Sequence, residues 1–223
     1  MKTVRYMLLI FSIYFLFVNA VFAQQSHNDS VTLETKIYID LWVNTLYFIQ
    51  NDQVVEKFKV APGKNDSPTP IGTFKVVEKS KDWGGGFGTR WIGLDVPWGN
   101  YGIHGTNRPE LIGERVSSGC VRMFNDDVEK LYNMVPIGTV VHIDGPITGV
   151  GEGEFKNLSL GSKGTLVQIV QQRLKAGKYY NGRIDGMYDE ETERAVKKFQ
   201  RKHNLYVTGG ITKTEYNLLG ILE

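Results

Sequence analysis

The sequence predicts two globular domains, a mostly β domain over residues 32–148 and a small three-helix domain over residues 157–222. In the first region, apolar and polar residues alternate over residues 36–43, and β-rich runs separated by turn residues follow, which is typical of strands. In the second region apolar residues recur every three to four positions, which is typical of helices. Between them, residues 149–156 have the glycine-rich composition of a linker. A chain of 223 residues has room for two such domains.

A hydrophobic segment precedes both domains. Lys2 and Arg5 come before an apolar run, which ends in small residues and a polar stretch beginning at Gln24. This arrangement is typical of a secretory signal peptide over residues 1–23, cut after Ala23. The alternative is an uncleaved anchor, because the apolar run is almost long enough to span a membrane. In both cases we expect an exported protein that touches the membrane only through this segment.

The β domain is expected to begin with a strand over residues 36–43. Its apolar face would hold Ile37, Ile39, Leu41 and Val43. Further strands are predicted over residues 45–50, 54–60, 73–78, 91–94, 102–104 and 139–143. One helix interrupts them, with apolar residues at positions 128, 131, 132 and 135 and with Asn125 as its cap. This region is therefore mostly β with one clear helix.

Three helices are predicted in the second domain. The first carries an apolar stripe of Leu166, Val170 and Leu174. The second opens with the acidic run 189–191, which suits the positive end of a helix dipole. Its inward-facing residues are Thr192, Ala195, Val196 and Phe199. Thr212 and Glu215 have the spacing of a capping box and predict the start of the third helix.

Charge and cysteine content exclude several classes of function. The chain has 26 basic and 24 acidic residues, and a net charge of +2 is too small to indicate a nucleic-acid partner. That charge comes from the signal segment, because residues 1–23 hold two basic and no acidic residues and the rest of the chain is neutral. Within the rest, the β domain is net −2 and the helical domain is net +5. A single cysteine excludes a disulfide framework, and the four histidines lack the short spacing of a zinc peptidase. We therefore expect no metal and no cofactor.

Cys120 and His104 are the best candidates for chemistry. A thiol attacks carbonyl groups as the thiolate, and a histidine is its usual base. His104 ends a predicted strand, and Cys120 follows Gly119 in a turn that can return the thiol to the imidazole. The Gly119 and Cys120 amides could bind a developing oxyanion, beside Ser118, while Arg122 could orient a carboxylate or a carbonyl. The alternatives are an inert buried cysteine and a histidine that only serves a turn.

Four motifs in order resemble the catalytic domain of the YkuD-type L,D-transpeptidases, bacterial cell-wall enzymes. They are Pro68-Thr69-Pro70-Ile71-Gly72-Thr73-Phe74, Phe87-Gly88-Thr89-Arg90, Tyr101-Gly102-Ile103-His104-Gly105-Thr106 and Ser117-Ser118-Gly119-Cys120-Val121-Arg122-Met123. The resemblance covers residues 36–143. It implies a β-sandwich-like fold with one or two helices, Cys120 as nucleophile, His104 as base, and the Gly105 carbonyl as the group that orients the imidazole.

Two positions depart from the pattern of many family members. Ser118 and Arg122 stand where those members carry histidine and asparagine, so the details of the oxyanion hole are open. Trp91 and Tyr101, with Phe87 and Trp98, could wall a substrate groove, although aromatic residues at such spacings also form cores. Asn107 and Arg108 are further candidate substrate contacts. His142 lies among apolar residues of the last strand, which indicates a structural role.

The resemblance implies acyl transfer on peptidoglycan stem peptides. Cys120 would attack the carbonyl between a diamino acid and D-Ala, and an amine of a second stem would then form a 3→3 cross-link. Attack by water would make the enzyme an L,D-carboxypeptidase, and attack by a lipoprotein lysine would make it an anchoring enzyme. Carbapenem-type inhibitors would acylate Cys120. A non-catalytic wall-binding protein is the alternative from another class, whereas a sortase is disfavoured by the short His-to-Cys spacing and the Cys-x-Arg string.

The helical domain resembles peptidoglycan-binding modules of the three-helix type. Its matching residues include Asp185, Gly186, Phe199 and Gln200. The net charge of +5 suits a wall rich in carboxylates, or it reflects only a solvated basic face. We expect a monomer in the cell wall whose partners are stem peptides and glycan strands.

Overall fold

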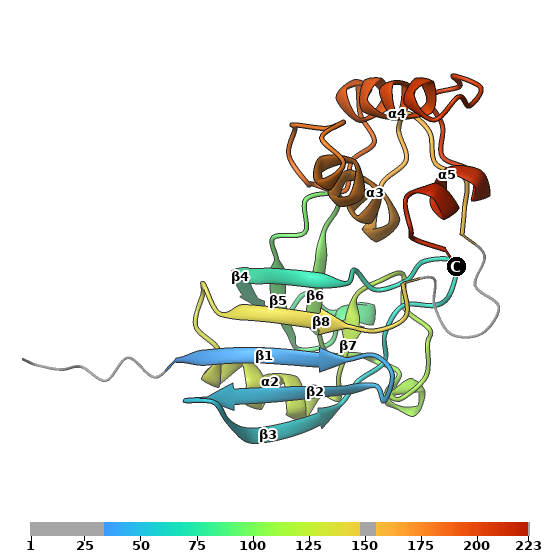
Figure 1. Ribbon diagram of the computed structural model, residues 1–223. Helices are drawn as coiled ribbons and strands as arrows, with labels where there is room; N and C mark the ends of the chain where they lie inside the picture. Colours follow the sequence, from blue (N-terminus) through green and yellow to red (C-terminus); the bar gives the residue numbers. More distant parts are fainter. Residues whose placement is uncertain (1–33, 148–154, 223) are drawn as a thin grey trace, which may run out of the picture. The chain divides into compact units, whose positions relative to one another are not determined.

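The computed structural model describes residues 34–147 and 155–222 (Figure 1). The predicted signal peptide and most of the predicted linker lie outside these residues. In the described part of the chain, no helix is both long enough and apolar enough to cross a membrane.

Eight strands form one sheet in the order β3-β2-β1-β8-β4-β5-β6-β7 (Figure 1). The strands are β1 (Thr35–Asp40), β2 (Thr45–Gln50), β3 (Gln53–Lys59), β4 (Gly72–Lys81), β5 (Arg90–Leu94), β6 (Tyr101–His104), β7 (Val121–Arg122) and β8 (Val140–Asp144). Neighbours pair antiparallel except β1 with β8 and β6 with β7, which are parallel. The chain thus returns to the middle of the sheet with its last strand.

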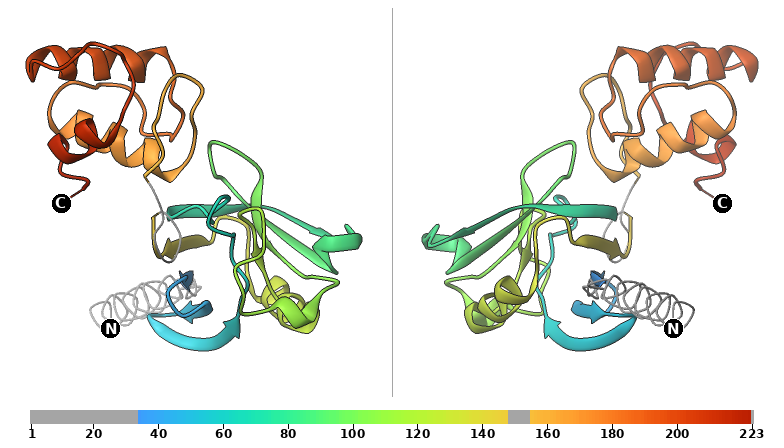
Figure 2. Two further views of the ribbon diagram at one scale, coloured as in Figure 1. Left: turned by 90° about the vertical axis from the view of Figure 1, so that its right-hand side faces the viewer. Right: turned by 90° about the vertical axis from the view of Figure 1, so that its left-hand side faces the viewer.

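The long strand β4 bends the sheet. Its first residues, 72–75, pair with β8, whereas residues 76–81 pair with β5 across an irregularity between Val76 and Glu78. A strand that serves two halves of a sheet makes a corner between them. The helix α2 (Asn125–Met134) packs against β5 and β6 inside the resulting curl (Figure 2). The prediction of a mostly β domain with one clear helix is confirmed, and its two layers belong to one curled sheet.

The core lies between the two halves of the curled sheet and under α2. Ile39, Phe48, Ile92, Ile103 and Leu131 are among its fully buried members. Burying such a side chain contributes about 1.5–3 kcal/mol. Ile37, Ile39 and Leu41, three of the four residues that the alternation of the first strand places inward, are buried.

The first strand ends earlier than its alternation predicts. The Asp40 carboxylate accepts the amide N–H groups of Trp42 at 2.8 Å and Val43 at 3.3 Å, and Asn44 follows with φ 51°. Val43 is 60% exposed, so its predicted place on the buried face is wrong. An aspartate side chain that binds the following amides competes with the strand ladder and starts a turn.

Three helices, α3 (Thr165–Ala176), α4 (Glu190–Lys202) and α5 (Lys213–Leu218), form the C-terminal region, as predicted. The Asp189 carboxylate caps α4 by accepting the Thr192 amide at 2.8 Å. Thr212 and Glu215 form the predicted capping box of α5. The inward residues predicted for α4, Thr192, Ala195, Val196 and Phe199, are all buried.

Two buried glutamines, Gln171 and Gln200, form hydrogen bonds with the turns between these helices. The Gln171 carbonyl accepts the Gly186 amide at 2.8 Å, and its NH2 group lies 3.0 Å from the Met187 carbonyl. One helix later, the Gln200 carbonyl accepts the Gly209 amide at 2.9 Å, and its NH2 group lies 3.0 Å from the Glu215 carboxylate. Each glutamine thus satisfies the backbone of the turn that leads into the next helix.

Candidate active site

Strand register places His104 and Cys120 on one face of the sheet. β6 and β7 run parallel, with Ile103 beside Val121 and His104 beside Arg122. Residues two apart on a strand point to the same side, so Cys120, just before β7, faces the same way as Arg122. Two residues that lie 16 positions apart in sequence therefore share one cavity.

The His104 imidazole is fixed by its neighbour. Its Nδ1 lies 2.6 Å from the Gly105 carbonyl oxygen, and since a carbonyl only accepts, Nδ1 carries the proton. The other nitrogen, Nε2, is then the basic one. Burial lowers the pKa of His104 to about 4, with a smaller lowering by the Arg122 charge, while the hydrogen bond to Gly105 opposes both. The imidazole is therefore neutral at pH 7.

The Cys120 thiol is also neutral at pH 7. Burial raises its pKa, and two weaker effects oppose that rise, a hydrogen bond from the Gly102 backbone and the charge of Arg122. A neutral thiol beside a neutral imidazole is the ground state that these directions favour. Proton transfer to His104 must then accompany the attack of sulfur on a carbonyl.

Ser117 holds the turn that presents the thiol. Its hydroxyl donates to the Cys120 carbonyl at 2.5 Å and accepts the Gly119 amide at 3.0 Å. Gly119 has φ 112°, and a Cβ there would lie 2.6 Å from the Tyr101 ring, so the position requires glycine. Ser117 engages the Gly119 amide that we expected to bind an oxyanion. Of the two predicted donors, the Cys120 amide is the remaining candidate.

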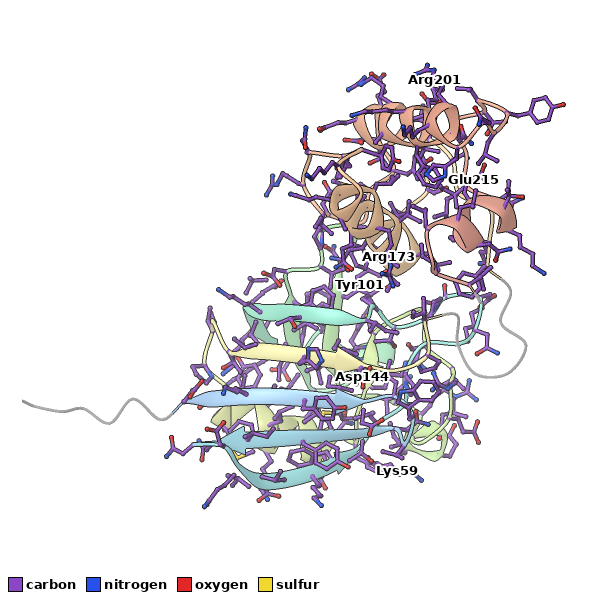
Figure 3. All side chains as sticks on the ribbon, viewed as in Figure 1. Lys59, Tyr101, Asp144, Arg173, Arg201 and Glu215 are labelled. Atoms are coloured by element: carbon purple, nitrogen blue, oxygen red, sulfur yellow. The ribbon has the colours of Figure 1, made fainter. Side chains whose placement is uncertain are left out.

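A cavity of about 560 Å³ surrounds these groups. It is lined by Val77, Glu78, Trp83, Gly86, Phe87, Trp91, Gly93, Leu94, Asn100, Tyr101, His104, Ser117, Ser118, Cys120 and Arg122. Most of the predicted site residues are in this set, and Figure 3 marks Tyr101.

Three predicted contacts lie elsewhere. Asn107 is exposed and does not line the cavity. Arg108 pairs with Glu110 at 3.2 Å. Trp98 is buried in the core, edge-on to Phe74 at 6.2 Å between ring centroids.

Aromatic rings stack over the imidazole. Trp91 stacks on His104 with 5.7 Å between centroids, and Trp83 stacks on Trp91 at 4.7 Å. The Phe87 ring also lies against the imidazole, with 5.0 Å between the two ring centroids. These rings exclude water from the imidazole and account for its lowered pKa. Sequence reasoning missed Trp83, although a tryptophan beside a glycine run was a usable signal.

Asn125 has a different role from the one its position predicts. Its side chain makes no cap for α2, and Phe124 occupies the N-cap position instead. The Asn125 side-chain oxygen accepts the amides of Thr106 at 3.1 Å and Thr89 at 3.4 Å. A Cβ on Gly105 would lie 2.2 Å from that oxygen. Asn125 therefore positions the peptide whose carbonyl orients His104.

His142 lies away from this cavity. Its Nδ1 is 2.8 Å from the Thr73 hydroxyl, and its ring stacks on Tyr38 at 5.8 Å. These contacts join three neighbouring strands, which fits the expected structural role. In the described residues, no group of three His, Cys, Asp or Glu side chains is arranged to hold a metal ion.

Two protein families match the sequence. The L,D-transpeptidase catalytic domain matches residues 34–143, and a peptidoglycan-binding domain matches residues 163–219. Among solved structures, the chain is similar to the catalytic domain of the Enterococcus faecium L,D-transpeptidase. The two are 27% identical, the comparison covers 51% of this chain and 99% of that one, and the TM-score is 0.44.

Relatives named as L,D-transpeptidases match about half of the chain. YkuD of Bacillus subtilis (strain 168) is 40% identical over 52% of this chain and 70% of its own length. YkuD of Bacillus licheniformis is 42% identical over 50% and 67%, and YqjB of Bacillus subtilis is 40% identical over 48% and 69%. With these identities and the shared catalytic domain, the chain belongs to the L,D-transpeptidase family of acyl-transferring enzymes.

Proposed function

We propose that this protein forms 3→3 cross-links in peptidoglycan with Cys120 as nucleophile and His104 as general base. The observation that carries the proposal is the common cavity of the two side chains, with the imidazole held in one tautomer by the Gly105 carbonyl. A nucleophile, a base within one cavity and a group that orients the base are the parts that acyl transfer needs.

In the first step the Cys120 sulfur attacks the carbonyl that joins the diamino acid to the terminal D-Ala. The S–C bond forms while the thiol proton moves to His104 Nε2. The C–N bond then breaks, and the same proton passes to the nitrogen of D-Ala, which leaves. The product is a thioester on Cys120, and His104 returns to its neutral form.

In the second step an amine of a neighbouring stem attacks the thioester. Its proton goes to His104 Nε2, the C–N bond forms, and the proton then passes to the departing sulfur. No net charge or proton is left on the enzyme. Attack by water through the same steps would give hydrolysis, so access of water to the thioester decides between the two products.

Two further groups would stabilise charge in these steps. The Cys120 amide is the proposed donor to the oxyanion of the tetrahedral intermediate. The Arg122 guanidinium lines the cavity, and its Nε is buried with no hydrogen-bond partner among the described residues. A guanidinium with a free Nε–H is suited to the carboxylate of the leaving D-Ala.

The C-terminal region would keep the enzyme near its substrate. Its basic balance, net +5 over residues 157–222, attracts a wall rich in carboxylates, and the family match supports peptidoglycan as its ligand. We further propose that the chain is exported to the cell wall and acts there as a monomer. Detection in the wall fraction and the mass of the purified protein in solution test these two points.

Product analysis tests the proposed function. Purified enzyme is incubated with a disaccharide-tetrapeptide, and the products are weighed by mass spectrometry. A cross-linked dimer that has lost one D-Ala supports the proposal. A tripeptide without dimer would make the enzyme a carboxypeptidase. Unchanged substrate would refute both activities and favour the non-catalytic wall-binding alternative.

A carbapenem supplies a second and independent probe of the nucleophile. Such an inhibitor carries a strained carbonyl that an activated thiol opens without a second substrate. We expect a stable adduct on wild-type enzyme and none on the Cys120→Ala variant, measured as intact protein mass. An adduct on both proteins would place the reactive group elsewhere.

A further inference from the structure

We infer that Glu78 and the Trp91 indole form a subsite for the side-chain end of the diamino acid that becomes acylated on Cys120. This inference rests on the proposed function and names the group that the same cavity recognises. Glu78 was absent from every expectation based on the sequence. Its position follows from strand register instead.

Glu78 and Cys120 lie in one row across the sheet. Glu78 on β4 pairs with Gly93 on β5, and Gly93 pairs with Gly102 on β6. By the parallel register of β6 and β7, Cys120 lies beside Gly102. Neighbouring strands are 4.7–4.9 Å apart, so the two backbones are about 14 Å apart on the same face.

The two glycines between them make room for the Trp91 ring. A Cβ on Gly93 would lie 2.9 Å from Trp91 Nε1, and a Cβ on Gly102 would lie 2.8 Å from the far edge of the indole. The ring therefore lies across both positions and forms the floor between Cys120 and Glu78. Side chains larger than hydrogen at either glycine would displace it.

The indole N–H points to a ligand. Trp91 is 3% exposed, and its Nε1 has no hydrogen-bond partner among the described residues. The point where a Cβ of Gly93 would lie is 2.9 Å from Trp91 Nε1 and 3.4 Å from the Glu78 carboxylate oxygen Oε2. Buried N–H groups are nearly always paired, so an unpaired one that lines a cavity indicates an oxygen atom of the substrate.

The chemistry of this pair matches one end of a diamino acid. A carboxylate pairs with an ammonium group, and an N–H donor pairs with a carboxylate or carboxamide oxygen. The extended side chain of such a residue spans about 7 Å from its carbonyl carbon to its terminal amine. With its carbonyl on Cys120 and the side chain along the Trp91 ring, the amine reaches Glu78.

Charge at the two ends of the cavity gives the donor one orientation. Glu78 and Arg122 are the charged side chains among the described lining residues besides the titratable His104 and Cys120. Arg122 lies beside His104, and Glu78 lies at the opposite end of the row that ends at Cys120. A donor with an amine at one end and the D-Ala carboxylate at the other fits in one direction.

Donor peptides that differ only in the side chain at position three test the subsite. Tetrapeptides carry lysine, norleucine or meso-diaminopimelate at position three, and the rate of D-Ala release gives kcat/KM for each. Norleucine keeps the four side-chain carbons of lysine and lacks the terminal ammonium group. The enzymes are wild type, Glu78→Gln and, as a matched control, Glu114→Gln, because Glu114 is exposed and does not line the cavity.

We expect wild type and Glu114→Gln to prefer lysine over norleucine by about two- to fivefold, the range for an ion pair with an exposed carboxylate such as that of Glu78. Glu78→Gln should bring this ratio close to one while it still releases D-Ala from the norleucine donor. Wild type should also prefer meso-diaminopimelate over lysine, because its terminal carboxylate accepts the Trp91 N–H, and a Trp91→Phe variant should lose this preference.

The inference is overturned if Glu78→Gln keeps the wild-type ratio of lysine to norleucine. Equal effects of Glu78→Gln and Glu114→Gln would overturn it too, because they would indicate only a general effect of net charge. If wild-type enzyme released D-Ala from none of the three donors, the proposed function itself would fail. The two failures are therefore distinguishable.

Discussion

The two described regions of the chain differ in how fully their buried polar side chains are hydrogen-bonded. In the helical region, Gln171 and Gln200 are fully buried and each is bonded to the turn that follows its helix. In the β region, by contrast, several buried side-chain atoms have no hydrogen-bond partner among the described residues. They are Asn44 Oδ1, Ser80 Oγ, Thr89 Oγ1, Arg90 Nε, Trp91 Nε1 and Arg122 Nε.

Two of these six residues, Trp91 and Arg122, are the ones that we propose to serve a ligand. A buried polar group without a partner costs about 1–3 kcal/mol, so a fold keeps few of them. Trp91 and Arg122, two residues with such atoms, line the catalytic cavity. In the helical region the paired glutamines instead fix the backbone. Mutations should therefore cost activity in the first region and stability in the second.

Cys120→Ala should give the largest effect. Removal of the nucleophile is expected to lower the rate of D-Ala release by about 10³-fold or more. The free energy of unfolding should change by less than about 1 kcal/mol, because the thiol supports no buried network. Enzyme assays and denaturant unfolding followed by tryptophan fluorescence measure the two quantities. Substantial residual activity would remove Cys120 from its proposed role.

Gln171→Leu should produce the reverse pattern. It leaves the Gly186 amide and the Met187 carbonyl without their partner and should destabilise the helical region by about 3 kcal/mol. The neighbouring Gln172→Leu is the matched control, since Gln172 is exposed and should change stability by less than about 0.5 kcal/mol.

The two regions can be observed separately in the Gln171→Leu experiment. All four tryptophans of the chain lie between positions 42 and 98, so fluorescence follows the β region, while far-UV circular dichroism follows the helices. The dichroism transition should move to lower denaturant and the fluorescence transition should stay. If Gln171→Leu and Gln172→Leu shift the dichroism transition equally, Gln171 does not hold the turn that leads into α4.

Asn125→Ala should lower activity because the Gly105–Thr106 peptide, which orients His104, loses a hydrogen-bond partner. Asn125 itself takes no part in the reaction. The variant leaves the amides of Thr89 and Thr106 without the side-chain oxygen that holds them. We expect a loss of about tenfold in kcat/KM and of about 1–2 kcal/mol in stability. Asn133→Ala, an exposed asparagine of the same helix, is the control. Equal kinetics in both variants would show that Asn125 does not position His104.

The smallest expected effect is that of mild acid. Because the pKa of His104 is lowered to about 4, the imidazole stays in its basic form as the pH falls from 7 to 5. The rate kcat/KM should then fall by less than about twofold, and the loss should begin only near pH 4. A histidine with an ordinary pKa of about 6.5 would lose about 25-fold between pH 7 and pH 5. A profile with that larger loss would contradict the burial of the imidazole.

The sequence predicts that His104 and Cys120 lie together in one cavity because its motifs are local. His104 with Gly105, and Ser118 to Arg122, are short strings whose spacing is visible along the chain. The helices of the C-terminal region were predictable for the same reason, since capping at Asp189 and at Thr212 depends on residues three positions apart.

Contacts between distant strands were not predictable in this way. Glu78 reaches the cavity through the irregular register of β4 against β5, which no local pattern reports. Asn125 looked like a helix cap, and only the fold shows that its oxygen binds Thr106 instead. Val43 continued the alternation of its strand, but the Asp40 carboxylate had already begun a turn. In each case a side-chain hydrogen bond or a shift in strand register, and not the periodicity of the sequence, determines where the residue lies.

Trapping the acyl-enzyme tests the central claim most directly. Enzyme is mixed with a stem tetrapeptide, stopped in acid after a short time and digested, and the peptide that contains Cys120 is weighed. We predict a mass increase equal to the donor minus D-Ala, on Cys120 and on no other residue. Release of D-Ala with an unmodified Cys120, or an adduct on a different side chain, would contradict the account.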